Sequence, residues 1–218
     1  ANFLCNPIKT GAPTARCTIF VTEDAERTMV TFLGASVNLS EDNIEERFFK
    51  DVSILFIEGY LWSSETARRS IKKAVKFAKN FKIKVAFSLS DPGLVKSFKN
   101  DFEDFIHSDV DIILGNYSEF QNLFDEKNDS ALAKKLNGMV DIAVMTKGGS
   151  QSTAFQNNNF TKCDSVKNIK IIDTTGAGDM FAAGFLFKYN QGLHIKECLE
   201  FASETAARII SQYGARFD

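Results

Sequence analysis

The pattern of apolar and polar residues divides the chain into a short β-rich start and a longer stretch in which strand-like and helix-like segments alternate. Near the start, segments 17–22 and 28–33 are rich in β-branched and aromatic residues, and the polar segment 23–27 separates them. This arrangement predicts an antiparallel β hairpin. Because the segments after it follow a different pattern, we expect the hairpin to be an appendage to the main sheet.

The remaining segments alternate between short apolar runs, which predict buried strands, and apolar residues at helical spacing. Such alternation predicts a mostly parallel sheet covered by helices on both faces, which is a three-layer α/β/α fold. Helical material is also expected after the chain break at 91–93. The predicted strands are 52–57, 85–89, 110–114, 142–146, 153–155 and 169–172, and the predicted helices are 40–50, 64–80, 118–125, 129–136, 176–190 and 195–212.

Composition and charge exclude several classes of function. The chain has 218 residues, of which 44% are hydrophobic, and its net charge is −2. Its basic residues are scattered, and the densest cluster, at 68–73, falls on the solvated face of one predicted helix, so nucleic acid is not an expected partner. No apolar run is long enough to span a membrane, and the start has no signal pattern. These features favour a cytoplasmic protein without a membrane partner.

The cysteines show no metal-binding spacing, and only two histidines accompany them. We therefore expect reduced, packed thiols rather than a metal centre or a set of disulfides. The four are Cys5, Cys17, Cys163 and Cys198.

A glycine-rich motif at 173–179 is the main candidate for chemistry. It reads Asp-Thr-Thr-Gly-Ala-Gly-Asp and joins a predicted strand to a predicted helix, whose first N–H groups attract anions. Gly176 and Gly178 let the backbone approach a ligand, and Asp179 projects from the first helical turn. This combination predicts phosphoryl transfer with Asp179 as the base. The alternative is a glycine-rich turn in which Asp179 only caps the helix.

Polar residues also follow two other predicted strands. In parallel sheets, ligands bind beyond the carboxyl ends of the strands. Asn116 and Glu119 stand at the start of a predicted helix, where they could orient waters on a magnesium ion, although Glu119 could equally be a capping residue. Thr146 and Gly148 could lie near phosphates, or could simply form a tight turn between strands.

The motif at 173–185 resembles the C-terminal signature of the PfkB, or ribokinase-like, family of carbohydrate and nucleoside kinases. Asn116-Tyr117-Ser118-Glu119 resembles the family's Asn-x-x-Glu motif, Glu26-Arg27-Thr28-Met29 its hairpin turn, and Tyr213-Gly214-Ala215-Arg216 its C-terminal Gly-Ala-Arg. The segments 60–62, 88–92 and 110–116 look most like the adenosine-kinase branch and its sugar-kinase neighbours.

The resemblance implies a ribokinase-like fold with a small β-hairpin lid, and ATP-dependent phosphorylation of a hydroxymethyl group on a nucleoside or sugar. Adenosine is the first candidate acceptor. Asp179 would be the base, and Gly176, Ala177 and Gly178 would form the anion hole. Glu119, acting through water, and Asn116 would organise the phosphates of ATP and its Mg²⁺.

Further roles follow from the same resemblance. Thr146 and Gly148 would contact the nucleotide, and adenine would lie against Phe201 and Ala202. In several relatives the residues matching Asp173 and Thr175 belong to a loop that holds a monovalent cation such as K⁺, with backbone help near Gly214. The chain departs from the family at Gln151 and Ala25, where a glycine is usual in each case.

The resemblance also divides the chain into a lid and connection, 1–36, and a kinase core, 37–218, that lacks the family's N-terminal portion. We therefore expect the 218 residues to be part of a longer kinase and to be inactive alone, and we expect acceptor choice to lie largely in the absent portion. Three alternatives stay open. The acceptor could be a sugar, as in fructokinases and ribokinases; the protein could be a catalytically silent nucleotide-binding homologue; and the hairpin could be a simple edge element rather than a lid and homodimer surface.

Overall fold

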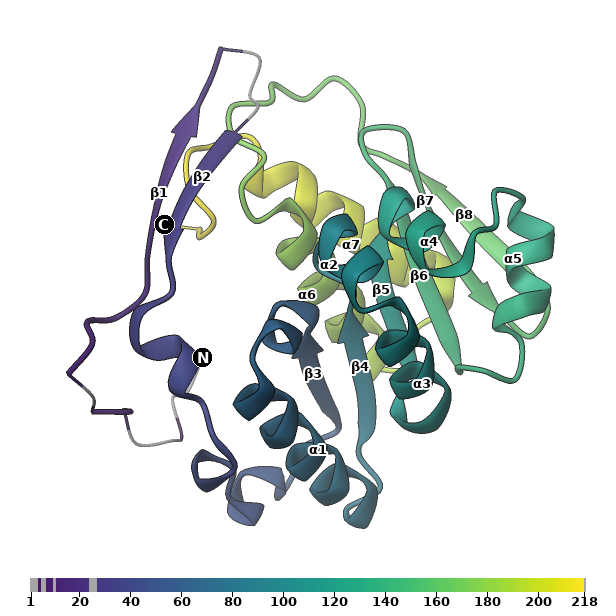
Figure 1. Ribbon diagram of the computed structural model, residues 1–218. Helices are drawn as coiled ribbons and strands as arrows, with labels where there is room; N and C mark the ends of the chain where they lie inside the picture. Colours follow the sequence, from purple (N-terminus) through teal and green to yellow (C-terminus); the bar gives the residue numbers. More distant parts are fainter. Residues whose placement is uncertain (1–3, 5–6, 10, 24–26, 218) are drawn as a thin grey trace.

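The structure is a computed structural model that describes residues 4, 7–9, 11–23 and 27–217. The predicted hairpin is confirmed: β1 (Arg16–Val21) pairs antiparallel with β2 (Arg27–Phe32). The hairpin stands apart from the main sheet (Figure 1), and its strand residues are almost all exposed. The turn residues Ala25 and Glu26 lie outside the described residues.

The predicted parallel sheet is also confirmed. Six strands lie in the order β3-β4-β5-β6-β7-β8; β3 to β6 are mutually parallel, and β7 and β8 are antiparallel additions. β8 was not predicted because its apolar residues are few. The bounds are β3 (Ile54–Glu58), β4 (Lys84–Ser88), β5 (Ile112–Asn116), β6 (Ile142–Lys147), β7 (Gln151–Gln156) and β8 (Asn159–Asp164).

Helices cover both faces of this sheet, as Figure 1 shows. One apolar cluster joins one face to the first five helices, and a second joins the other face to the last two. The predicted three-layer architecture is therefore confirmed. The bounds are α1 (Glu65–Asn80), α2 (Pro92–Ser97), α3 (Lys99–Asp109), α4 (Tyr117–Phe124), α5 (Asp129–Leu136), α6 (Ala177–Asn190) and α7 (Ile195–Ile209).

An aromatic cluster fills the first interface. The ring of Trp62 lies 5.4 Å from that of Phe102, and the ring of Phe87 lies 5.0 Å from that of Phe102 and 5.2 Å from that of Phe105. All four side chains are buried. Edge-on contacts of this kind add to the free energy of burial, so these aromatic residues belong to the core.

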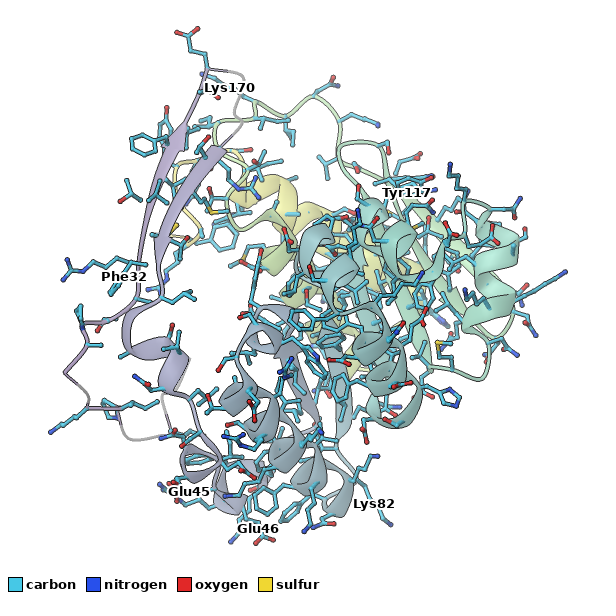
Figure 2. All side chains as sticks on the ribbon, viewed as in Figure 1. Phe32, Glu45, Glu46, Lys82, Tyr117 and Lys170 are labelled. Atoms are coloured by element: carbon cyan, nitrogen blue, oxygen red, sulfur yellow. The ribbon has the colours of Figure 1, made fainter. Side chains whose placement is uncertain are left out.

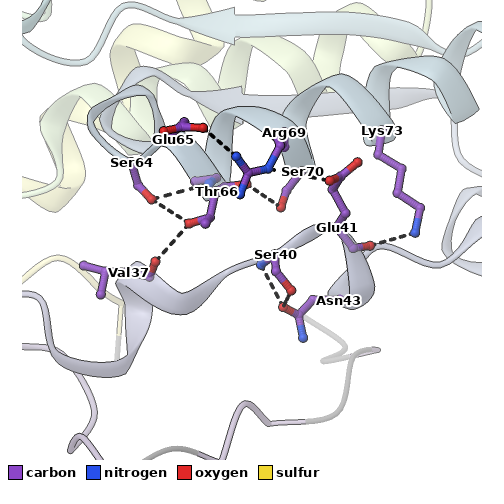
Figure 3. Close-up of polar contacts among 11 residues, drawn as sticks. Val37, Ser40, Glu41, Asn43, Ser64, Glu65, Thr66, Arg69, Ser70 and Lys73 are labelled. Carbon is purple, nitrogen blue, oxygen red and sulfur yellow. Dashed lines mark hydrogen bonds and ion pairs between the residues drawn. The ribbon is translucent and has the colours of Figure 1, made fainter.

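The predicted helix at 40–50 is wrong. Its place is taken by two short 3-10 turns, Glu41–Asn43 and Glu46–Phe49, with extended backbone between them. The carbonyl oxygen of Glu41 accepts hydrogen bonds from Ile44 N at 3.1 Å and from Lys73 Nζ at 2.7 Å, instead of from the residue four positions later. Figure 3 shows this contact and the Ser40–Asn43 cap that closes after one turn. Docking onto α1 therefore overrides the helical pattern.

The predicted strand at 169–172 is also wrong. This segment has no strand partner among the described residues; the N–H groups of Ile172 and Asp173 both donate to the carbonyl of Ile210, at 2.8 and 3.3 Å. The segment lies beside the end of α7, where a single carbonyl, that of Ile210, accepts both hydrogen bonds. A strand would need a row of alternating donors and acceptors on its neighbour. The segment is therefore an extended connection that leads into α6.

Some apolar side chains are exposed to solvent. β3 is an outer strand of the described sheet, and Phe56 on it is 40% exposed.

Cys17 is exposed, so the expectation of a packed thiol is wrong there, whereas Cys163 and Cys198 are buried as expected. No helix formed by the described residues is both long enough and apolar enough to cross a membrane.

Candidate active site

The parallel strands β3 to β6 all end at one edge of the sheet (Figure 1), and the residues at this edge come from distant parts of the chain. Glu58 ends β3, Asn116 ends β5 and Lys147 ends β6. The charge of Asp179, at the start of α6, influences both Glu58 and Tyr60. The start of α6 therefore lies within electrostatic range of this edge of the sheet.

The glycine motif turns sharply before α6. Gly176 has φ +79°, and a Cβ atom there would lie 2.9 Å from the Cβ of Ala215, so only glycine fits this position. Beside Gly178 a Cβ atom would meet nothing within 4 Å. The helix starts at Ala177, whose N–H donates to the carbonyl of Thr174 at 3.3 Å, and the next N–H groups lack partners within the helix. The motif thus leaves open space beside a helix start that attracts anions.

Asp179 lies exposed in the first turn of α6. No described residue forms a hydrogen bond or ion pair with its carboxylate, and α6 has no side-chain cap. The capping alternative therefore lacks a capping hydrogen bond. A carboxylate without a described partner, beside the open space at Gly178, is available to accept a proton from a ligand.

Glu58 and Tyr60 also lie at this edge of the sheet, although Glu58 was predicted only to follow a strand and Tyr60 was marked only by the resemblance of segment 60–62. Burial raises the pKa of Glu58, and the neighbouring charge of Asp179 raises it further. The pKa of Tyr60 is raised by burial and by surrounding carboxylates, including Asp91 and Asp179. Nothing in the local sequence marks this convergence, since it arises from the order of the strands.

Asn116 and Glu119 form a reciprocal cap at the start of α4. Asn116 Oδ1 accepts from the N–H of Glu119 at 2.9 Å, and Glu119 accepts from Asn116 N at 2.8 Å and from Asn116 Nδ2 at 2.7 Å. The capping alternative for Glu119 is therefore correct as geometry. Glu119 is also only 4% exposed. Burial raises its pKa to about 7, with Asp91 adding to the rise and Asn116 opposing it.

Asp173 is buried and holds two segments together. Its Oδ1 accepts from the N–H of Thr175 at 2.8 Å, and its Oδ2 accepts from the N–H of Gly214 at 2.9 Å. Burial opposes its ionisation, but these hydrogen bonds outweigh burial and lower the pKa of Asp173. The hydroxyl of Thr175 is buried beside this carboxylate and helps the backbone bonds to lower the pKa of Asp173. An ionised carboxylate with a neighbouring hydroxyl suits a monovalent cation, and the bonds of Asp173 also support its simpler role in fixing the turn.

Thr146 and Gly148 stand where β6 turns into β7. Thr146 is paired in register with Asn116 on the neighbouring strand. Gly148 has φ +54°, and β6 and β7 pair antiparallel around it, so the tight-turn interpretation is correct. The turn nevertheless places Thr146 directly beside the start of α4.

The predicted adenine contacts differ in their surroundings. Ala202 is completely buried, and its Cα would lie 3.0 Å from a Cβ atom on Gly184 of α6. It has no surface to offer a ligand, because the close packing of α6 and α7 covers it. Phe201 is partly exposed and lies near Phe187 and Lys188. Only Phe201 stays available for the predicted contact.

The hairpin touches the glycine motif at Arg27, a residue that the sequence marked only by resemblance. Arg27 Nη1, on β2, donates a hydrogen bond to Thr174 Oγ1, and its charge also favours ionisation of Asp173. A two-stranded hairpin has little stability of its own, so this contact helps to fix where the hairpin lies.

Comparisons with known proteins agree with this geometry. The model of the pfkB family carbohydrate kinases matches residues 5–218. The 5-dehydro-2-deoxygluconokinase of Listeria monocytogenes is 25% identical over 187 residues, and the adenosine kinase of Dictyostelium discoideum is 29% identical over 227 residues. These alignments cover 83% and 95% of this chain.

The crystal structure of adenosine kinase from Sinorhizobium meliloti has the same fold. It superposes with a TM-score of 0.93 and 32% sequence identity over 98% of this chain. The chain spans 66% of that protein, and 58% and 65% of the length of the Listeria and Dictyostelium relatives.

Proposed function

Because the chain belongs to the pfkB family of carbohydrate kinases, we propose that it supplies the phosphoryl-transfer part of an ATP-dependent kinase acting on a hydroxymethyl group of a nucleoside or sugar. The observation that carries the proposal is the free carboxylate of Asp179 next to the glycine turn at Gly176. A capping hydrogen bond or a salt bridge would give Asp179 a purely structural role. Among the described residues, its carboxylate forms neither.

The proposed reaction uses the residues of the motif in two roles. Asp179 accepts the proton of the acceptor hydroxyl as the hydroxyl oxygen attacks the terminal phosphorus of ATP, and the bond from that phosphorus to the bridging oxygen breaks and releases ADP. The N–H groups at 176–178 stabilise the negative charge on the transferring phosphoryl group. Because Gly178 leaves open space beside these N–H groups, phosphate oxygens can approach them.

Asn116 and Glu119 are proposed to organise the phosphates from the neighbouring strand end. These two residues would hold a hydrated Mg²⁺, which would neutralise negative charge on the phosphates. The donor set suits a hydrated ion, since Glu119 is held by two hydrogen bonds from Asn116 and can accept further bonds from ordered waters. Thr146, in register with Asn116, is proposed to face the same phosphates.

The pKa of Glu119 predicts a pH dependence. Its pKa is about 7, so the ionised form that attracts hydrated Mg²⁺ becomes scarce at lower pH. We expect kcat/KM for Mg·ATP to fall by up to about tenfold per pH unit below about pH 6.5 and to level off above about pH 8, because kcat/KM reports groups of the enzyme form that Mg·ATP binds. The measurement is a pH profile at saturating acceptor. Glu119→Gln should lower activity and remove this step; a wild-type profile that is flat down to about pH 5.5 would contradict the assignment.

Adenosine is the proposed acceptor, on the strength of the Sinorhizobium and Dictyostelium relatives. A sugar is the second candidate, because the Listeria 5-dehydro-2-deoxygluconokinase matches the chain at a similar identity. A panel of adenosine, ribose, fructose and 5-dehydro-2-deoxygluconate tests this. The readout is ADP formation by the native protein, that is, the full-length chain that contains these 218 residues. We expect turnover with adenosine and little with the sugars. Turnover with a sugar alone would move the assignment to the sugar kinases.

A catalytically silent nucleotide-binding homologue is the alternative from another class. It would bind ATP and turn over none of these acceptors. The intact glycine motif with its free Asp179 favours the active kinase.

The hairpin is proposed to act as the lid of this site. Its contact through Arg27 with Thr174 places it against the loop that leads into the glycine turn. A lid excludes water and so protects ATP from hydrolysis. A homodimer formed through the exposed hairpin stays a prediction, which light scattering on the native protein tests.

A further inference from the structure

A small charged cluster lies behind the candidate phosphate site, on the opposite face of the sheet from α6. It consists of Asp129, at the start of α5, and two lysines from different strands. Lys147 Nζ, at the end of β6, lies 3.2 Å from Asp129 Oδ1, and Lys162 Nζ, on β8, lies 2.7 Å from Asp129 Oδ2. The acid therefore bridges two strands that are not neighbours.

The contact between Asp129 and Lys147 is well shielded from water. The Asp129 side chain is 14% exposed and that of Lys147 is 22% exposed, whereas that of Lys162 is 43% exposed. Burial opposes ionisation of Asp129, but hydrogen bonds from Lys162 and Lys147 outweigh it, so the pKa of Asp129 is lowered. Shielded pairs are weakened less by salt than exposed ones.

Lys147 has a second partner. Its ammonium lies 5.1 Å from the centre of the Tyr117 ring, within the range of a cation–π contact. Tyr117 is the first residue of α4 and directly follows Asn116 (Figure 2). Lys147 therefore contacts the start of the helix that carries Glu119.

The direction of the Lys147 side chain follows from the alternation along β6. Ala143 and Met145 belong to the cluster on the side of α1 to α5, whereas Val144 belongs to the cluster on the side of α6 and α7. By the same alternation Lys147 projects toward α4 and α5, and Thr146 projects toward α6. Lys147 thus supports the β6–β7 turn from behind instead of facing the phosphates.

We propose that Lys147, held by Asp129, is a positioning residue that fixes the β6–β7 turn against the start of α4 and so sets the spacing of the two phosphate-binding segments. The inference rests on the proposed function, since it concerns the nucleotide part of that site. If the contacts of Lys147 with Asp129 and Tyr117 are lost, the β6–β7 turn is free to shift relative to the start of α4. The cost falls on nucleotide binding and not on the acceptor or on proton transfer.

The test compares Lys147→Met with Lys162→Met in the native protein. Methionine keeps an unbranched apolar chain over Tyr117 and removes the ammonium group, with its charge and its hydrogen bond to Asp129. We expect the KM and the directly measured Kd for ATP to rise about tenfold in Lys147→Met, with kcat and the acceptor KM within about twofold of wild type. Lys147→Arg should restore ATP affinity to within about threefold. Lys162→Met breaks the outer ion pair, so it should leave ATP affinity unchanged even if its melting temperature falls.

Two further outcomes separate the alternatives. If Lys147 instead contacted phosphate directly, Asp129→Asn would release it and tighten ATP binding; the proposal expects weaker binding, so a lower Kd would overturn it. An unchanged ATP Kd in Lys147→Met would also overturn it. If the wild-type protein binds ATP but transfers no phosphate to any acceptor, the proposed function fails, while the Kd comparison still decides the role of Lys147.

Discussion

Replacing Asp179 by asparagine should lower kcat about a thousandfold while leaving the Kd for ATP within about threefold of wild type, because a positioned general base typically contributes 10²–10⁴ in rate. Asparagine keeps the size of the side chain and cannot accept the proton. The carboxylate makes no hydrogen bond or ion pair with any described residue, so its removal leaves no described partner unsatisfied. Steady-state turnover with adenosine and calorimetric titration with ATP measure the two quantities.

The matched control is Glu197→Gln. Glu197 is also an acid in the first turn of its helix, α7, where it accepts a hydrogen bond from the N–H of His194 at 3.0 Å. If first-turn acids here serve only the helix dipole, the two variants should both lose stability by up to about 1 kcal/mol and keep turnover. We expect Glu197→Gln to keep its turnover and Asp179→Asn to lose it. Retained turnover in Asp179→Asn would show that the base is misassigned.

Replacing Gly184 by alanine should destabilise the fold by about 2–3 kcal/mol, because overpacking a tight interior contact costs about this much. A Cβ atom there would lie 2.3 Å from Thr205 Oγ1 and 3.0 Å from the Cα of Ala202, so α6 and α7 must move apart. The contact orients the helix that carries Asp179, and urea unfolding of the native protein measures its cost.

Gly178→Ala is the control for this substitution. Gly178 lies in the same helix, and a Cβ atom there meets nothing within 4 Å. Alanine is the better helix former by up to about 1 kcal/mol, so stability should stay level or rise. The added methyl group should instead weaken ATP binding, because it enters the proposed phosphate space. Equal stability in the two variants would contradict the close packing of α6 on α7.

Much of the fold could be predicted because its signals are local. The strong periodicity of α1 and the apolar runs of β3 to β6 gave those elements within one or two residues, and the helix at Asp129–Leu136 was predicted with its exact bounds. The failures came where tertiary contacts decide the conformation. Lys73 takes the carbonyl of Glu41 that a helix at 40–50 needs, and Ile210 takes the donors that a strand at 169–172 would use.

The candidate site divides in the same way. The glycine motif and the Asn116–Glu119 pair are short segments whose chemistry can be read in the sequence. By contrast, the influence of Asp179 on Glu58 depends on how α6 packs on the sheet, which the local sequence does not show. The ion pair of Asp129 with Lys147 likewise depends on how α5 packs on the sheet. Ala202 was misjudged because residue type and helical position do not reveal how closely Gly184 allows α6 to approach.

The most direct test of the central claim is to follow the phosphorus atom. Phosphorus NMR of the native protein with Mg²⁺, ATP and adenosine should show ADP and a phosphate monoester on the hydroxymethyl carbon appearing in equal amounts, at a rate that Asp179→Asn lowers about a thousandfold. ATP that binds and stays intact with every acceptor of the panel, or that yields only inorganic phosphate, would contradict the account.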